Sequence, residues 1–156
     1  MKKLVVVLIA VLLICASASA QRRTVSYAGA GLVSNLSDMV GAGASFGVRN
    51  YNRQAFVSFT YGAEAYAYII PSDMQYGVFA VPEIGVAIGP KGFKVFPHTG
   101  LMFGYDSGAN GFHWGGKDGL AFDFGKNFTV DFSTYIPRYS FDTVTYAVSI
   151  IWRFGK

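Results

Sequence analysis

Apolar and polar positions alternate along most of the chain, and residues 143–154 show this pattern most clearly. Bulky apolar residues occupy every second position there from Val144 to Phe154, and the positions between them are small or polar apart from Ile151. A period of two is that of a β-strand, whose successive side chains point to opposite faces. We therefore predict a strand with one apolar face, close to the about 9–11 residues that a tilted strand needs to cross a bilayer.

Seven further stretches alternate in the same way, separated by clusters of residues that favour turns. The eight predicted strands are Arg23–Val33, Met39–Arg49, Gln54–Ile70, Met74–Ile88, Phe93–Tyr105, Gly119–Gly125, Phe128–Pro137 and Thr143–Phe154. A glycine-rich loop, Asp106–Asp118, is expected before the sixth strand, which is short unless residues 112–117 extend it. The predicted fold class is all-β, an antiparallel up-and-down eight-stranded barrel.

Two prolines, Pro82 and Pro97, fall inside the fourth and fifth predicted strands, where each removes a backbone donor from the ladder. Counted outward from the turn at residues 89–92, they lie near one another across the hairpin. We expect a shared β-bulge, with a poorly paired patch as the alternative.

The first twenty residues have the pattern of a secretory signal peptide. Lys2 and Lys3 precede an apolar run, and the small residues Ala18 and Ala20 stand where signal peptidase cleaves. We predict a signal peptide at residues 1–20 and one β-barrel domain at residues 21–156, and Cys15 would be removed with the signal peptide.

Composition narrows the class of protein. Charged residues make up 14% of the chain, against about 25% in soluble domains. No stretch after the signal peptide has 18 consecutive apolar residues, so membrane helices are not expected. Without the two lysines of the signal peptide, 11 basic residues stand against 9 acidic ones, and this small excess gives no support to nucleic-acid binding.

Alternation alone does not say whether the apolar face points into or out of the barrel. A secreted soluble barrel that binds an apolar ligand would turn it inward. However, the interior of an eight-stranded barrel is only wide enough for side chains to fill. The apolar set is bulky, as in Phe103 and Phe132, whereas the opposite set is largely Gly, Ala, Ser and Thr. The smaller set fits the lumen, so we expect a transmembrane barrel.

Aromatic residues also separate by strand end when both termini are placed in the periplasm. The residues expected at the periplasmic interface are Phe46, Phe93, Phe124, Phe128, Trp152 and Phe154, and those expected at the outer interface are Tyr66, Tyr68, Tyr76, Tyr105, Tyr135 and Tyr146. Two aromatic girdles of this kind flank the apolar band of transmembrane barrels.

With these girdles and a last strand that ends on an aromatic residue, Phe154, the chain resembles the small eight-stranded outer-membrane proteins of the OmpX and OmpA-barrel type. The resemblance is one of architecture. It implies the outer membrane of a Gram-negative bacterium as the location, outer-membrane lipid as the surroundings and the barrel-assembly machinery as a partner during biogenesis. It also implies a structural or surface-interaction role, and we expect a monomer.

Charged residues at inward positions are expected to fill the lumen. They are Arg49, Glu64, Glu83, Lys94, His98, Asp123, Asp131 and Arg153. Counting from the turns sets Glu83 directly opposite His98. It also predicts a row around the periplasmic end in the order Lys94, Asp123, Asp131, Arg153. Because neighbouring carboxylates repel unless cations flank them, we predict a salt-bridged plug rather than an open pore.

Catalysis is the main alternative function. His113 lies in the expected loop with Ser107, Asp106 and Asp118 nearby, which are the residue types of a Ser/His/Asp arrangement in a lipid-A-modifying enzyme. The glycines of that loop argue against rigid placement, and the inward His98 is expected to be structural. The chain has no glycine-rich phosphate loop, dinucleotide fingerprint or metal-spaced Cys/His cluster. We therefore expect no catalytic residues, cofactor or metal.

The hairpin of the third and fourth predicted strands is the longest. About 16 residues at ~3.3 Å each exceed what a tilted crossing requires. We therefore expect Tyr66–Tyr76 to protrude beyond the outer interface with an exposed edge, to which an extracellular protein partner could add a strand.

Overall fold

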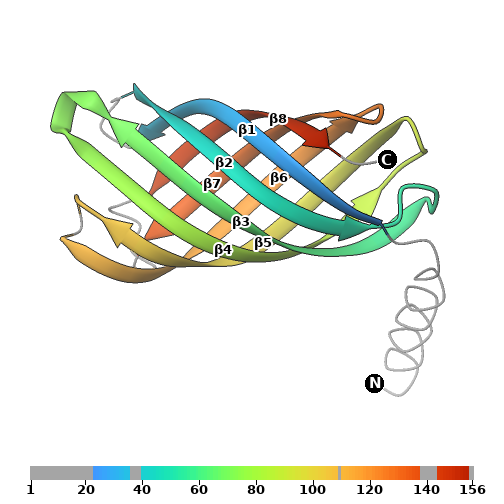
Figure 1. The fold of residues 1–156 in the computed structure, drawn as a ribbon, viewed down its shortest axis with the longest axis horizontal. Coiled ribbons are helices and arrows are strands. Elements are labelled where there is room, and N and C mark those ends of the chain that lie inside the picture. Colours follow the sequence, from blue (N-terminus) through green and yellow to red (C-terminus); the bar gives the residue numbers. More distant parts are fainter. Residues whose placement is uncertain (1–22, 36–39, 109, 138–143, 155–156) are drawn as a thin grey trace, which may run out of the picture.

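The computed structural model describes residues 23–35, 40–108, 110–137 and 144–154, which form a closed antiparallel barrel of eight strands (Figure 1). The strands are β1 (Arg23–Asn35), β2 (Val40–Tyr51), β3 (Val57–Ile70), β4 (Gln75–Ile88), β5 (Phe93–Asp106), β6 (Gly111–Phe124), β7 (Phe128–Pro137) and β8 (Thr145–Phe154). Each pairs with the next along the chain, and β1 pairs with β8. The predicted all-β up-and-down barrel is confirmed. The predicted signal peptide and the turn at residues 138–142 lie outside the described residues.

The two ends of the barrel are distinguished by the chain segments that they carry. β1 begins and β8 finishes at one end, which we call the terminal end, and the β3–β4 and β5–β6 turns lie at the other, the hairpin end (Figure 1). A 3-10 turn, η2 (Pro71–Asp73), joins β3 to β4. Among the described residues, no helix is both long and apolar enough to span a membrane.

Side-chain exposure alternates with period two, so the strands have an inner and an outer face. Along β8, Tyr146 and Ile150 are exposed, whereas Thr145, Ile151 and Arg153 are buried inside the barrel. Towards the hairpin end the buried set forms an apolar cluster of Val33, Tyr66, Tyr68, Ile70, Phe79, Val81, Met102, Tyr135 and Ala147. A smaller cluster of Tyr51, Ala87, Phe96 and Ala121 lies towards the terminal end. Charged side chains occupy the space between these two clusters.

The predicted loop Asp106–Asp118 is wrong for most of its length, because β6 already begins at Gly111. The alternative, in which residues 112–117 extend the sixth strand, is confirmed. The segment pairs with β5 from Asp106↔Gly111 onward and with β7 from Gly115↔Pro137 onward. The backbone of this glycine-rich segment is therefore held by two neighbouring strands, which the local sequence does not reveal. β7, by contrast, has the bounds that alternation predicted.

Pro82 and Pro97 interrupt the β4–β5 ladder without forming a bulge. Pairs run from Gly77↔Asp106 to Ala80↔Phe103, from Glu83↔Gly100 to Gly85↔His98, and again at Ile88↔Val95. The register is the same on both sides of each gap, so no residue has been inserted and the predicted shared bulge is wrong. The gaps fall at Pro82 and opposite Pro97, each of which lacks an N–H donor. The alternative, a poorly paired patch, describes this region.

The edge predicted over Tyr66–Tyr76 is not free in the structure. β3 pairs with β2 as far as Ile69, and β4 pairs with β5 from Gly77. Beyond these pairs, the N–H of Ser107 donates to the carbonyl of Tyr76 at 2.9 Å. Neighbouring strands therefore cover most of the backbone that an added strand would need.

Candidate functional site: the charged lumen

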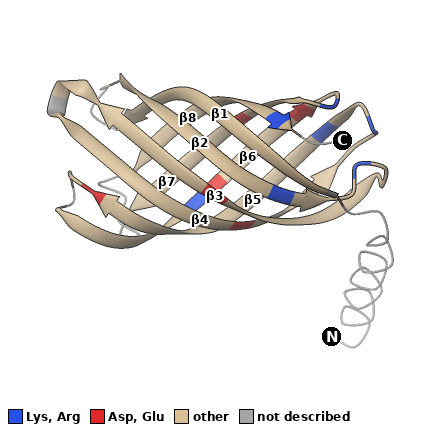
Figure 2. Cartoon of the chain, in the orientation of Figure 1, with Lys and Arg blue, Asp and Glu red and all other residues tan. Residues whose placement is uncertain are grey.

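A cluster of charged side chains occupies the middle of the lumen, and we call it the central cluster. It consists of Arg49, Glu64, Glu83, His98, Lys117 and Asp131. None of the six is more than 5% exposed. Figure 2 shows charged residues in the middle of the barrel and towards its terminal end. Charges buried to this degree are stable only when ion pairs and hydrogen bonds compensate them.

Lys117 is the most deeply buried cation of the central cluster, with no exposed surface. Its Nζ lies 2.8 Å from Oε1 of Glu64, 3.5 Å from Oε2 of Glu83 and 3.9 Å from Oδ2 of Asp131. One ammonium group therefore faces carboxylates from three different strands and ties β3, β4 and β7 to β6.

Arg49 supplies the second fixed positive charge. Its Nε and Nη2 donate to Oε1 of Glu83 at 3.1 and 3.0 Å. The guanidinium carbon also lies 4.1 Å from the ring centroid of Phe96 and 5.2 Å from that of Tyr27. A guanidinium suits this position because its flat face stacks on rings while its edge binds a carboxylate.

His98 lies between two carboxylates. Its Nε2 is 3.0 Å from Oδ1 of Asp131, and its Nδ1 is 3.6 Å from Oε2 of Glu83. Tyr27 and Tyr135 donate to Glu64 at 3.1 and 3.2 Å. The tyrosine hydroxyls thus supply hydrogen bonds that the ion pairs alone do not provide.

A second group, the terminal cluster, lies inside the barrel near the terminal end. Its members are Tyr51, Asp123, Thr129 and Arg153. Nη1 of Arg153 lies 2.5 Å from Oδ2 of Asp123, to which Tyr51 donates at 3.0 Å, and Thr129 donates to Oδ1 at 2.6 Å. The carboxylate is therefore fully engaged, and the cluster joins β2, β6, β7 and β8 across the barrel.

All eight charged residues predicted at inward positions are buried, but one predicted pair across the β4–β5 hairpin is displaced. Glu83 lies opposite Gly100, and His98 lies opposite Gly85, so the pair is two residues out of register. The cause is the turn, where Gly89 has a φ of +135° and the N–H of Phe93 donates to the carbonyl of Pro90. The side chains of Glu83 and His98 still approach each other, because both are long enough to reach across the two-residue offset inside the lumen.

The predicted row at the terminal end is partly wrong. Lys94 does lie opposite Asp123, but its Nζ donates to the carbonyls of Ala55 and Gly89 at 2.5 and 2.8 Å. Arg153 contacts Asp123 and not Asp131. The reason is register: Asp131 pairs with Ser149, four residues before Arg153 on β8.

Sequence reasoning missed Lys117, because it fell in the expected loop. A signal was available: once β6 is extended, Lys117 shares the inward parity of Asp123.

Alternation between the two faces of a strand also corrects three predicted girdle residues. Tyr66, Tyr68 and Tyr135 are at most 5% exposed and point into the barrel, so their assignment to the outer interface is wrong.

The remaining predicted girdle residues lie on the outer face. Those that are exposed are Phe46, Phe93, Phe124, Trp152, Phe154, Tyr76 and Tyr146, and those that are partly buried are Phe128 and Tyr105. Rings on neighbouring strands contact each other there, as in Phe93 with Phe124 at 5.4 Å and Tyr76 with Tyr105 at 5.9 Å between centroids.

The Ser/His/Asp arrangement considered for residues 106–118 does not form. His113 and Asp118 are five positions apart on β6 and therefore lie on opposite faces, with Asp118 exposed on the outside. Oγ of Ser107 accepts from the N–H of Tyr76, and the carboxylate of Asp106 accepts from Tyr68 at 2.8 Å. Within the described part of the chain, no group of three or more His, Cys, Asp or Glu side chains could hold a metal ion.

The geometry defines a class, an up-and-down eight-stranded β-barrel with a charged lumen. Comparison with protein-family models, curated proteins and solved structures finds no match to the chain.

Proposed function

We propose that the protein is an integral outer-membrane β-barrel whose lumen is plugged by a charged network, and that its role is structural or in surface interaction, without catalysis. The observation that carries this proposal is the distribution of side chains between the two faces of the barrel. Large apolar side chains are exposed outside, such as Phe112 at 84%, Trp114 at 66% and Leu32 at 65%, while Lys117 and Glu64 are buried inside.

This distribution is the reverse of that in a water-soluble domain, which keeps charge outside and large apolar side chains inside. A largely apolar outer surface favours hydrocarbon as the surrounding medium. The lumen also argues against a soluble carrier of apolar ligands, because charged groups such as Arg49, Lys117 and Asp131 occupy the space where an apolar ligand would lie.

Two clusters of charged side chains, at different heights along the barrel axis, support the proposal of a closed lumen. The central cluster joins six strands, β2 to β7, and the terminal cluster lies between it and the terminal end. Opening a continuous water path would require breaking buried ion pairs, which are costly to separate. A structural or docking role therefore fits the proposal better than transport.

Cell fractionation tests the membrane placement. We expect the protein in the outer-membrane fraction, released by detergent but not by high salt or alkaline carbonate, and we expect its mobility on a gel to change on boiling. Recovery in the soluble periplasmic or secreted fraction would refute the proposal. Unchanged mass spectra of lipid A with and without the protein are expected, and a modified lipid A would instead support the enzyme.

The orientation can be tested separately with a short tag inserted at Ser72, an exposed residue of η2. We expect the tag to be reachable on intact cells, because both termini are placed in the periplasm. Any extracellular partner at this hairpin would then contact turn side chains such as Met74, which is 78% exposed. A tag reachable only from the periplasm would show the opposite topology.

A further inference from the structure

Asp118 is a charged side chain on the otherwise apolar outer face of β6. It is exposed and lies midway between the ends of the strand, with Trp114 on one side and Leu120 on the other. Its neighbours on the adjacent strands are Thr99 of β5 and Thr134 of β7. Asp118 has no ion pair or hydrogen bond with any residue that the structure describes.

If the barrel spans a membrane as proposed, the position of Asp118 places its carboxylate among lipid chains; this step rests on the proposed function. The midpoint of a spanning strand lies near the middle of the hydrocarbon layer, where an ionisable side chain is costly and is normally paired. No residue that the structure describes pairs with Asp118, so its carboxylate is open to a counter-charge from a bound molecule.

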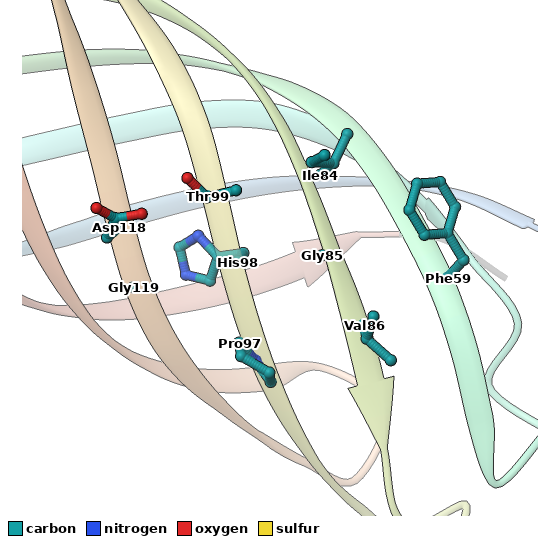
Figure 3. Close-up of a pocket in the computed structure, with 9 residues that line it drawn as sticks. All are labelled: Phe59, Ile84, Gly85, Val86, Pro97, His98, Thr99, Asp118 and Gly119. Carbon is teal, nitrogen blue, oxygen red and sulfur yellow. The ribbon is translucent and has the colours of Figure 1, made fainter. Parts of the chain in front are cut away.

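The outer face of the barrel beside Asp118 carries an open depression, which we call the hollow. It has a volume of about 410 Å³, and its lining includes Phe59, Ile84, Val86, Pro97, Thr99 and Asp118 (Figure 3). It lies where the β4–β5 ladder is interrupted opposite Pro97. Apolar side chains from β3, β4 and β5 form most of the lining. Its polar residues are Thr99, Asp118 and His98, and the ring of His98 is engaged with Glu83 and Asp131 in the lumen.

We propose that this hollow is a binding site for a single-chain amphiphile with an amine headgroup, which would enter from the side of the barrel. Ligand sites combine apolar contacts with a few convergent polar groups, and the hollow offers both. The alkyl chain would pack against Ile84, Val86 and Pro97. The ammonium group would pair with the carboxylate of Asp118 and donate to the hydroxyl of Thr99. A neutral or anionic headgroup would leave the carboxylate without a counter-charge.

The probe for the test is dodecylamine, titrated into the detergent-solubilised protein with ¹³C-labelled methyl groups on isoleucine and valine. We expect saturable chemical-shift changes at Ile84 and Val86. Dodecanol and lauric acid have the same chain length and should bind at least about tenfold more weakly. Equal binding of the amine and the alcohol would overturn the proposal.

Two variants distinguish the effect of the Asp118 charge from that of the side chains around it. Asp118→Asn keeps the size of the side chain and should weaken dodecylamine binding about tenfold, while leaving dodecanol unchanged. Thr134→Val alters the other neighbour of Asp118, outside the hollow, and should bind the amine as the wild type does. Unchanged amine binding by Asp118→Asn would refute the site, as would an Asp118→Cys variant that forms a disulfide-linked dimer in membranes, because a second copy would then cover it.

Failure of this inference and of the membrane proposal can be told apart. An outer-membrane protein that does not prefer the amine refutes only the binding site. A soluble protein that binds dodecylamine through Asp118 refutes only the membrane placement.

Discussion

Lys117 offers the most direct test of the luminal network, and we predict that Lys117→Met destabilises the barrel strongly. Methionine has a similar length and no charge, so the substitution removes the ammonium group and leaves the packing nearly unchanged. Lys117 is fully buried and lies within 4.0 Å of Glu64, Glu83 and Asp131. All three carboxylates lose their shared counter-charge.

The expected loss in the free energy of unfolding follows from the charges in the central cluster. Two fixed cations, Arg49 and Lys117, compensate the three carboxylates, and the substitution leaves only Arg49, which binds Glu83. Removing one partner of a buried ion pair costs about 3–5 kcal/mol. Glu64→Leu should cost less, about 2–3 kcal/mol, because Lys117 keeps the other two carboxylates while the tyrosines at Glu64 lose their acceptor.

The assay is equilibrium urea unfolding in detergent micelles, followed by tryptophan fluorescence. The double variant Lys117→Met with Glu64→Leu should lose at least about 1 kcal/mol less than the two single losses combined, since groups in contact are not additive. Lys91→Met, on an exposed turn residue, is the control and should change the free energy of unfolding by less than about 0.5 kcal/mol. If Lys117→Met resembled this control, or if the double loss were additive, the buried network would not stabilise the barrel.

Three further outcomes are expected. In urea unfolding, Arg153→Met and Asp123→Leu should be coupled by about 0.5–3 kcal/mol, whereas Arg153→Met and Asp131→Leu should be additive, and the reverse result would contradict the observed ion pair. Pro82→Ala should supply the missing donor opposite Leu101 and give an amide protected from hydrogen exchange, and rapid exchange at residue 82 would contradict this account of the gap. In planar bilayers the wild type should give no well-resolved single-channel conductance, and large steps would refute the plug.

Much of the fold followed from the sequence because the alternation of a strand is a local property. The period of two identified the eight strands, and turn residues placed their ends closely, as at Phe128–Pro137. Alternation also placed every charged residue that was predicted to be luminal on the inward face of its strand. The same rule would have placed Tyr66 and Tyr68 inside the lumen, since they share the parity of Glu64 on β3.

Tertiary structure decided which luminal groups meet. The glycines of residues 108–116 give no strand signal, so only pairing with β5 and β7 reveals β6 and brings Lys117 to the centre. Contacts across the lumen depend on barrel closure and on the register of every ladder, because a shift of two residues changes which side chains face each other. The sequence by itself therefore determined the strands and their faces. Closure of the barrel joined Lys117 to Glu64 and Arg153 to Asp123, since these pairs connect strands distant along the chain.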